Sequence, residues 1–300
     1  MKVLITGGTG TIGKKIIERY YNEWNIAVFS RDEYKQAILK KKYPKLNMII
    51  GDVKDYKSVE DALMGIDAVI HTAAMKRVEV CEPQPMEAVK TNILGTENII
   101  RAAKKLGIKR LVSISTDKGV EPVNMYGMTK AIQEKIVINN GFNCARYGNV
   151  FGSRGSIVEL FYKQSLTGNK LTVTDPNMTR FFLTTDDALS LIMKAFNEEM
   201  KGYIYVKKSP ALTIGALAKF FSDNVEIVGK GLAEKLHECL ISSEETTRTL
   251  DEGDYMIITQ ETINEFGKAY TSDSERVLSN EEVERMVEQW KLQSQEPQGA

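Results

Sequence analysis

Tyr126 and Lys130 are the residues whose types and spacing first indicate chemistry. They lie four residues apart, so in a helix the phenol and the ammonium share one face. A nearby cation favours an ionised phenol, and Tyr126 would then act as a base well below the ordinary tyrosine pKa of about 10. A surface pair without function has the same spacing, so this interpretation depends on the neighbouring motifs.

Four polar residues, Ser115 to Lys118, precede this helix. They end an apolar, β-branched run that begins at Leu111 and has the composition of a buried strand. Ligands of open α/β sheets bind at the carboxyl ends of the strands, which is where this polar cluster falls. Asp117 and Lys118 could supply an acid–base pair there, whereas in isolation such a dipeptide is most often a solvated ion pair.

A glycine-rich segment near the N-terminus gives the polar cluster its context. An apolar strand at 2–6 leads into GGTGTIG at 7–13, and an amphipathic helix follows to about residue 21. Glycines at this spacing allow a tight turn and let the backbone approach a pyrophosphate, to which the helix N-terminus offers free N–H groups. This order predicts dinucleotide binding, with contacts from Gly7, Thr9, Gly10, Thr11, Ile12 and Gly13.

The second predicted strand, 26–30, indicates which dinucleotide is bound. It ends in Ser30 and Arg31 rather than in the acid that usually holds the ribose of NAD. A serine beside an arginine suits a 2′-phosphate, so NADP is favoured and NAD is the alternative.

Later strands and a long helix add further expected cofactor contacts, from Asp52, Val53, Ala73, Ala74, Lys76 and Asn92. Asp52 either faces the adenine or caps the helix that follows it. Small residues at 73–74 let the backbone lie against the cofactor, and Lys76 could also reach a substrate phosphate. Asn92, in a helix predicted at 85–106, ties the sheet to the active-site turn.

Composition argues against several other classes of protein. The 40 Lys and Arg residues balance the 40 Asp and Glu residues, so no nucleic-acid or membrane-surface partner is expected. The three cysteines are scattered and there are only two histidines, so we expect reduced thiols, a cytoplasmic protein and no metal site. No apolar run approaches the length of a membrane span, and no signal peptide precedes the first strand.

Strands and helices alternate up to about residue 150, which predicts an α/β fold with a Rossmann-like doubly wound parallel sheet. The less regular pattern that follows predicts a smaller C-terminal α+β lobe that binds the substrate. We assign 1–150 and 183–208 to the NADP-binding domain. The substrate lobe is expected to comprise 151–182 and 209–300.

Taken together, the glycine loop, Thr116 and the Tyr126–Lys130 pair resemble the extended short-chain dehydrogenase/reductase superfamily over nearly the whole chain. Within it, several blocks are similar to the C5-inverting UDP-N-acetylglucosamine 4,6-dehydratases: STDK, NMYGMTK, RYGNVFGSRGS, DPNMTRFF, EKLHE and AYTSD. Those enzymes begin pseudaminic acid and related L-sugar pathways for flagellin glycosylation or capsule. The retaining dehydratases often have a membrane-anchored region and a methionine in place of Tyr126, and this sequence has neither. It departs from the family pattern at 119–121 and at Phe151.

This resemblance implies a hydro-lyase reaction with defined roles. Tyr126, kept ionised by Lys130 and the cofactor ring, takes the 4-hydroxyl proton while hydride passes to NADP, and Thr116 hydrogen-bonds the same oxygen. Lys118 removes the C5 proton, for which its pKa must fall toward neutral, and Asp117 protonates the departing 6-hydroxyl. Hydride then returns to C6, and C5 is reprotonated from the opposite face to give UDP-2-acetamido-2,6-dideoxy-β-L-arabino-hexos-4-ulose. NADP is regenerated in each cycle, so tight binding is expected.

The resemblance also implies a partner, UDP-N-acetylglucosamine or a close nucleotide sugar. Its expected contacts are Lys76, Asn149, Arg154, Arg180, Lys235 and His237, the last of which could equally be packed in the small lobe. Relatives of this kind suggest a homo-oligomer, either a dimer or a hexamer.

Three other functions stay open. A nucleotide-sugar 4-epimerase would use Tyr126 and Lys130 but has little need of the Asp117–Lys118 pair. A 5-epimerising capsule enzyme of the same superfamily would share all four residues. A non-catalytic NADP-binding sensor is disfavoured, because such proteins commonly lose the tyrosine or the lysine.

Overall fold

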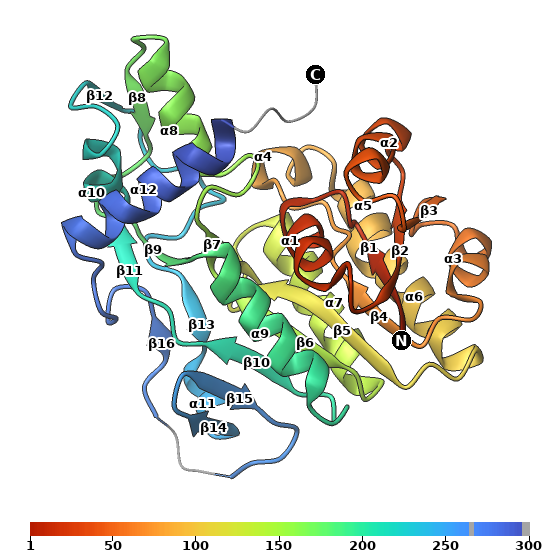
Figure 1. Ribbon diagram of the computed structural model, residues 1–300. Coiled ribbons are helices and arrows are strands. Elements are labelled where there is room, and N and C mark those ends of the chain that lie inside the picture. The colour runs from red at the N-terminus through yellow and green to blue at the C-terminus, as the bar shows by residue number, and fades with distance from the viewer. Residues whose placement is uncertain (264–266, 296–300) are drawn as a thin grey trace.

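The computed structural model describes residues 1–263 and 267–295. Its main element is a nine-stranded sheet made of β1 (Lys2–Thr6), β2 (Asn25–Ser30), β3 (Asn47–Ile50), β4 (Ala68–His71), β5 (Arg110–Thr116), β6 (Asn143–Tyr147), β10 (Ile204–Lys207), β14 (Thr249–Glu252) and β15 (Tyr255–Ile258). The spatial order is β14-β15-β10-β6-β5-β4-β1-β2-β3 (Figure 1). All neighbours from β3 to β10 pair in parallel, which confirms the predicted doubly wound parallel sheet.

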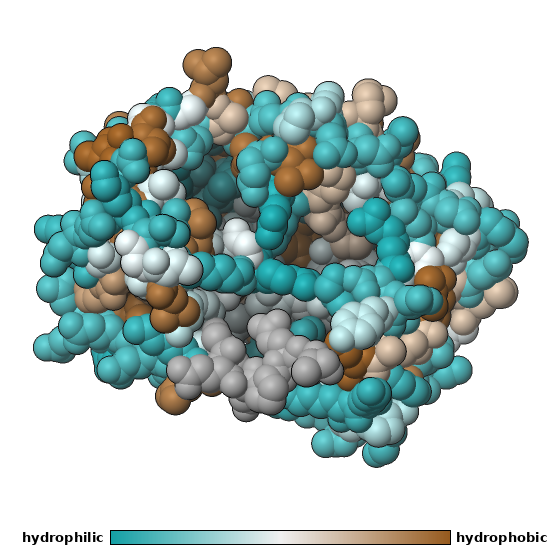
Figure 2. Space-filling view, turned by 90° about the horizontal axis from the view of Figure 1, so that it is seen from above, coloured by the Kyte–Doolittle hydropathy of each residue, from teal (hydrophilic) through white to brown (hydrophobic). Residues whose placement is uncertain are grey.

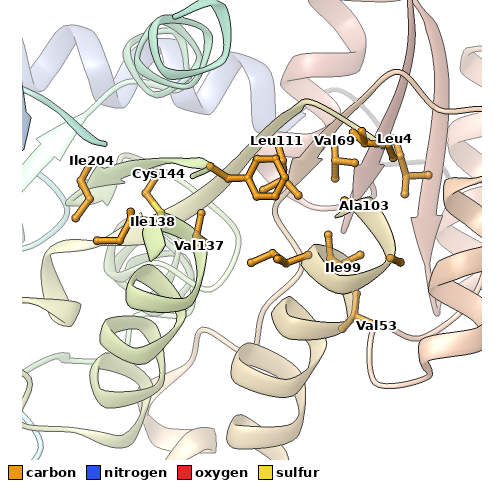
Figure 3. Close-up of a cluster of buried hydrophobic side chains, with 14 of the residues drawn as sticks. Leu4, Val53, Val69, Ile99, Ala103, Leu111, Val137, Ile138, Cys144 and Ile204 are labelled. Carbon is orange, nitrogen blue, oxygen red and sulfur yellow. The ribbon is translucent and has the colours of Figure 1, made fainter. Parts of the chain in front are cut away.

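Helices cover both faces of this sheet. One face carries α3 (Tyr56–Leu63), α6 (Gly95–Lys105) and α7 (Met125–Asn139), and the other carries α1 (Thr11–Tyr20), α2 (Glu33–Lys42) and α9 (Thr185–Asn197). Figure 3 shows apolar side chains of α6 and α7 meeting those of β1, β4, β5 and β6. Strands buried on both faces need continuous apolar runs, which is what β1, β4 and β5 contain.

The predicted helix at 85–106 is interrupted. It consists of α5 (Pro85–Ala88), a π-helical turn at Val89–Leu94 and α6. Within that turn the Asn92 side chain accepts from Met75 N at 2.8 Å, and it donates to Met75 O and to Thr129 Oγ1, both at 2.9 Å. Asn92 thus ties the segment after β4 to α7, the link predicted from the sequence. Single π-turns are frequent at functional sites, because the extra residue redirects a side chain.

The remaining elements form a smaller α+β region. Its strands are β7 (Asn149–Val150), β8 (Leu171–Val173), β9 (Thr179–Leu183), β11 (Ala211–Thr213), β12 (Val225–Ile227), β13 (Cys239–Ile241) and β16 (Tyr270–Thr271). Its helices are α8 (Ile157–Leu166), α10 (Ile214–Lys219), α11 (Ser243–Thr246) and α12 (Asn280–Gln295), and the short α4 (Val78–Cys81) lies across from it at the edge of the larger part (Figure 1). An apolar cluster that includes Phe161, Phe182 and Val287 gives this region a core of its own.

One predicted boundary needs correction. The substrate lobe was expected to include everything from 209 onward, but β14 and β15 belong to the main sheet, with β15 antiparallel to β10. The pairing of β15 with β10 joins segments far apart in the chain, so no local sequence pattern predicts it. Residues 296–300 of the predicted lobe lie outside the described part of the chain. None of the described helices combines the length and apolar composition needed to cross a lipid bilayer.

Candidate active site

The carboxyl ends of β1, β2, β4 and β5 line a cavity of about 600 Å³. Seen from above, the molecule is hollowed near its centre, with hydrophilic side chains around the opening (Figure 2). The predicted site residues that line the cavity are Gly7, Thr9, Gly10, Thr11, Ile12, Ser30, Arg31, Asp52, Val53, Ala73, Ala74, Lys76, Thr116, Lys118, Tyr126, Lys130, Asn149 and Arg154. The other predicted residues are packed around it rather than along its wall: Gly13, Asn92, Asp117, Arg180, Lys235 and His237.

The glycine loop forms one end of the cavity. Gly7 has a φ of +65°, and a Cβ there would lie 2.9 Å from the backbone N and Cα of Ala73. Gly10 N donates to Gly7 O at 2.9 Å and closes the turn at the N-terminus of α1. The loop thus packs so closely on the segment after β4 that a side chain at position 7 would not fit. Its backbone forms a cradle at the N-terminus of α1, whose free N–H groups fit a pyrophosphate.

The tip of β2 lies beside this cradle. Ser30 Oγ accepts from Gln36 Nε2 at 2.9 Å, so its own hydrogen is directed elsewhere. Arg31 is 3.6 Å from the Asp52 carboxylate, and both line the cavity. The alternative in which Asp52 caps the next helix is wrong, because Asp55 is the residue that caps α3.

Helix α7 brings Tyr126 to the opposite end of the cavity. Asn124 caps the helix by accepting from Gly127 N at 2.8 Å. A Cβ at Gly127 would lie 2.0 Å from Lys118 O, so only glycine lets α7 approach the turn that carries Lys118. Burial raises the pKa of Tyr126 to about 12, although Lys118 and Thr116 act in the opposite direction.

Lys130 is held by acceptors of the protein itself. Its ammonium donates to Ile114 O and to Gln133 Oε1, and burial lowers its pKa to about 8. In the protein alone, the cation that favours ionisation of Tyr126 is Lys118 rather than Lys130. That Lys130 and the cofactor ring together keep Tyr126 ionised stays a prediction.

Asp117 and Lys118 follow β5, as predicted; Asp117 is fully buried and Lys118 is 20% exposed. Lys118 Nζ lies 3.1 Å from Asp117 Oδ1 and 3.1 Å from Asn149 Oδ1, while Thr116 Oγ1 donates to Asp117 Oδ1 at 2.9 Å. Burial raises the pKa of Asp117 despite the neighbouring ammonium. Asp117 Oδ2 has no partner among the described residues, which leaves room for a proton on that oxygen.

The third acceptor of Lys118 was not predicted. Glu238, which is 3% exposed, places Oε1 3.3 Å from Lys118 Nζ. Burial alone would lower the pKa of Lys118, but the Asp117 and Glu238 carboxylates outweigh burial and raise it. The fall toward neutrality that a lysine base requires is therefore absent here. The EKLHE block contains Glu238, but nothing in its local pattern sets this glutamate apart.

Three predicted substrate contacts are engaged with the protein itself. Arg180 donates to Thr179 O at 2.7 Å and to Lys235 O at 3.0 Å. Lys235 donates to Val120 O, and His237 Nδ1 lies 2.8 Å from Thr179 Oγ1. These side chains hold the 235–238 segment against β9 and against the turn after β5. In contrast, Arg154 lines the cavity, and its backbone N–H donates to Thr11 Oγ1 of the glycine loop at 3.3 Å.

A buried ion network also holds the segment that follows Glu238. Arg146 on β6 donates from Nε and Nη2 to the Glu134 carboxylate of α7, at 2.8 and 2.7 Å. Its Nη1 donates to Glu245 Oε2 of α11 at 2.7 Å and to Leu240 O at 2.8 Å. One guanidinium therefore links the helix that carries Tyr126 to the segment that carries Glu238. Within 1–263 and 267–295, no three His, Cys, Asp or Glu side chains are grouped so as to hold a metal ion.

Comparison with known proteins gives the chain a family. The sequence profile of a family described as "Polysaccharide biosynthesis protein" matches residues 3–260. A UDP-glucose 4-epimerase of Rickettsia canadensis (strain McKiel) is 43% identical over 276 residues, covering 84% of this chain and 81% of that protein. The corresponding protein of Rickettsia bellii (strain RML369-C) is 42% identical over the same length.

Solved structures agree with the fold. Pen from Bacillus thuringiensis is 34% identical and superposes with a TM-score of 0.90, covering 97% of this chain and 98% of that one. DesIV, a dTDP-glucose 4,6-dehydratase from Streptomyces venezuelae, shares the fold at 19% identity with a TM-score of 0.74, covering 98% and 97% of the two chains. On the profile match and the identity to these relatives, this chain belongs to the polysaccharide biosynthesis protein family.

Proposed function

We propose that this protein is a nucleotide-sugar 4,6-dehydratase that uses NADP, acts on UDP-N-acetylglucosamine and inverts C5. The observation that carries the proposal is the ion pair between buried Asp117 and cavity-lining Lys118, beside Thr116 and Tyr126. A reaction that only oxidises C4 has no need of a second acid–base pair. Elimination of water across C5 and C6 does need one, because one group must take the C5 proton and another must protonate the departing oxygen.

The cavity has the features that a dinucleotide requires. The backbone cradle at Gly7 and the N-terminus of α1 would hold the pyrophosphate, and Ser30 and Arg31 would reach the ribose or a 2′-phosphate. When bound, the nicotinamide accepts hydride from C4 and later returns it to C6. NADP is supported by Ser30 and Arg31 at the tip of β2, where the next acid, Asp32, lines the cavity but caps α2 by accepting from Lys35 N. The DesIV structure above was solved with NAD.

The remaining roles are assigned to this chain's own groups. Tyr126 would accept the 4-hydroxyl proton in its ionised form, which Lys118 favours and which the positive ring of a bound cofactor would favour further. Thr116 would bond the same oxygen. Asp117, whose pKa burial raises, would hold the proton that the departing 6-hydroxyl takes up. Lys118 lines the cavity and would face C5. Arg154, Lys76 and Asn149 would contact the nucleotide sugar from the second lobe and from the edge of the cavity.

The alternative is a UDP-sugar 4-epimerase. It is favoured by the names of the Rickettsia relatives, which are 41–43% identical to this chain. Such an enzyme returns hydride to C4, so its product retains the 6-hydroxyl. The 5-epimerising enzyme differs from the dehydratase in how it treats C5 and C6, and its product also retains that hydroxyl.

Proton NMR of the purified enzyme with UDP-N-acetylglucosamine in heavy water, without added cofactor, tests the proposal. A dehydratase gives a new C6 methyl signal with deuterium at C5, and the coupling constants report inversion. A product with an intact C6 hydroxymethyl group and inverted C4 would establish the epimerase instead. The experiment also shows whether a nicotinamide dinucleotide is retained through purification, because the reaction needs a hydride acceptor and none is added.

A further inference from the structure

The site contains one buried carboxylate for which the proposed chemistry has no role. Glu238 precedes β13 and is held in place by its backbone, because Glu238 N donates to Ser272 Oγ and Ser272 N donates to Glu238 O, both at 2.9 Å. Its Oε1 is 3.3 Å from Lys118 Nζ and 3.7 Å from Arg180 Nε. Its Oε2 is buried and has no partner among the described residues.

Lys118 therefore lies between two carboxylates. Its three polar neighbours are Asp117 Oδ1 at 3.1 Å, Asn149 Oδ1 at 3.1 Å and Glu238 Oε1 at 3.3 Å. An ammonium has three donors, and these three acceptors match them in number. A lysine held in this way is a cation, and a cation cannot take a proton from carbon unless it first gives one away.

The two carboxylates are not equivalent. Asp117 has a raised pKa, to which burial and the Glu238 charge both contribute, whereas the pKa of Glu238 is lowered because Lys118 and Arg180 outweigh its burial. Of the two, Asp117 is therefore the group that takes up a proton more readily, and Glu238 is the stronger acid. The charged or titratable groups that face Lys118 from the surrounding elements are Asp117, Glu238, Arg180 and Tyr126.

We propose that Glu238 is a positioning residue that receives a proton from Lys118, so that Lys118 can take the C5 proton of the substrate. The inference rests on the proposed dehydratase. In this step the C5–H bond breaks and its electron pair forms the C5–C6 double bond. The C6–O bond breaks with a proton from Asp117, and water leaves. The C5 proton joins Lys118 Nζ as an Nζ proton moves to Glu238 Oε1. Return of hydride to C6 would then let solvent reprotonate C5, after which Glu238 releases its proton and Asp117 regains one.

The geometry explains why this carboxylate lies behind the lysine. Glu238 is 3% exposed and does not line the cavity, whereas Lys118, which it contacts, does. A carboxylate in the cavity itself would meet the diphosphate of a nucleotide sugar with like charge. Behind Lys118 it can accept a proton and still lie away from the substrate.

The test measures incorporation of deuterium at C5 and the reduction of the cofactor separately, in wild type, Glu238→Gln and Glu238→Asp. Glu238→Gln keeps the shape but cannot accept the proton, so C5 incorporation at neutral pH should fall about a hundredfold while hydride transfer from C4 persists. Its rate should also rise with pH, because Lys118 must then lose a proton to solvent, whereas the wild-type rate stays nearly flat. Glu238→Asp should recover part of the loss.

Glu244→Gln is the matched control, since it makes the same carboxylate-to-amide change at an exposed position of α11, away from Lys118 and from the Arg146 network. It should leave the pH profile of C5 incorporation unchanged. The proposal is overturned if Glu238→Gln incorporates deuterium at the wild-type rate, or if it loses C4 oxidation and C5 incorporation equally with no change in pH profile. A wild-type enzyme that puts no deuterium at C5 would overturn the dehydratase itself, and the role of Glu238 with it.

Discussion

Replacing Arg146 by methionine should destabilise this protein severely. The guanidinium is 2% exposed and holds Glu134 and Glu245, whose side chains are 5% and 15% exposed. Removing it leaves the buried Glu134 carboxylate without its cation, leaves Glu245 with Arg248 at 3.5 Å, and takes away the donor that Arg146 gives to Leu240 O. Breaking a buried ion pair in this way costs about 3–5 kcal/mol. For a chain of this length that loss corresponds to a fall in the melting temperature of about 10 °C.

The assay is thermal unfolding of both proteins followed by circular dichroism at neutral pH. Arg19→Met is the control, since Arg19 pairs with Glu23 at 2.6 Å but both side chains are more than half exposed. An exposed pair of this kind contributes less than about 1 kcal/mol. Equal melting temperatures for the two variants would refute the reasoning. Adding Glu134→Gln and Glu245→Gln to Arg146→Met should restore part of the stability, because no buried charge is then left unpaired.

Two further predictions concern the nucleotide end and the sheet. Gly7→Ala should reduce the cofactor that co-purifies with the protein about tenfold or more, because a Cβ would meet the Ala73 backbone at 2.9 Å. The control is Gly65→Ala, since Gly65 has a φ of +72° and open space around it. Equal cofactor content in the two variants would contradict the proposed backbone cradle. Burial, assisted by Lys130, lowers the pKa of His71 to about 3, so the folded protein binds fewer protons than the unfolded chain below about pH 6.5. Stability should therefore fall by about 1.4 kcal/mol per pH unit as the pH drops from 6 to 4, and urea titrations should show His71→Gln lacking that slope.

The parts of the molecule that depend on residues close together in the sequence could be predicted from it. The strand, glycine loop and helix at the N-terminus depend on residues within about 20 positions of one another, and the structure has them as expected. Asp117, Lys118 and Tyr126 lie within ten residues of sequence, so their location near the carboxyl end of β5 could also be predicted. Parallel pairing of β1 to β6 required only the alternation of strands and helices.

What could not be predicted comes from contacts between distant segments. Glu238 reaches Lys118 because β13 pairs with β16 and the segment before it folds back onto the turn after β5. Arg180 and Lys235 are charged side chains in polar motifs, and only the fold shows that they bond to backbone carbonyls. Pairing of β15 with β10 is of the same kind, since it joins residues about 50 positions apart.

The central claim is that the Asp117–Lys118 pair removes water from the substrate, and mass spectrometry tests it most directly. Purified enzyme is incubated with UDP-N-acetylglucosamine without added cofactor, and the nucleotide-sugar product is weighed. A dehydratase yields a product lighter than the substrate by one water, and Lys118→Met should yield none. A product of unchanged mass that is a different sugar would contradict the account and establish an epimerase.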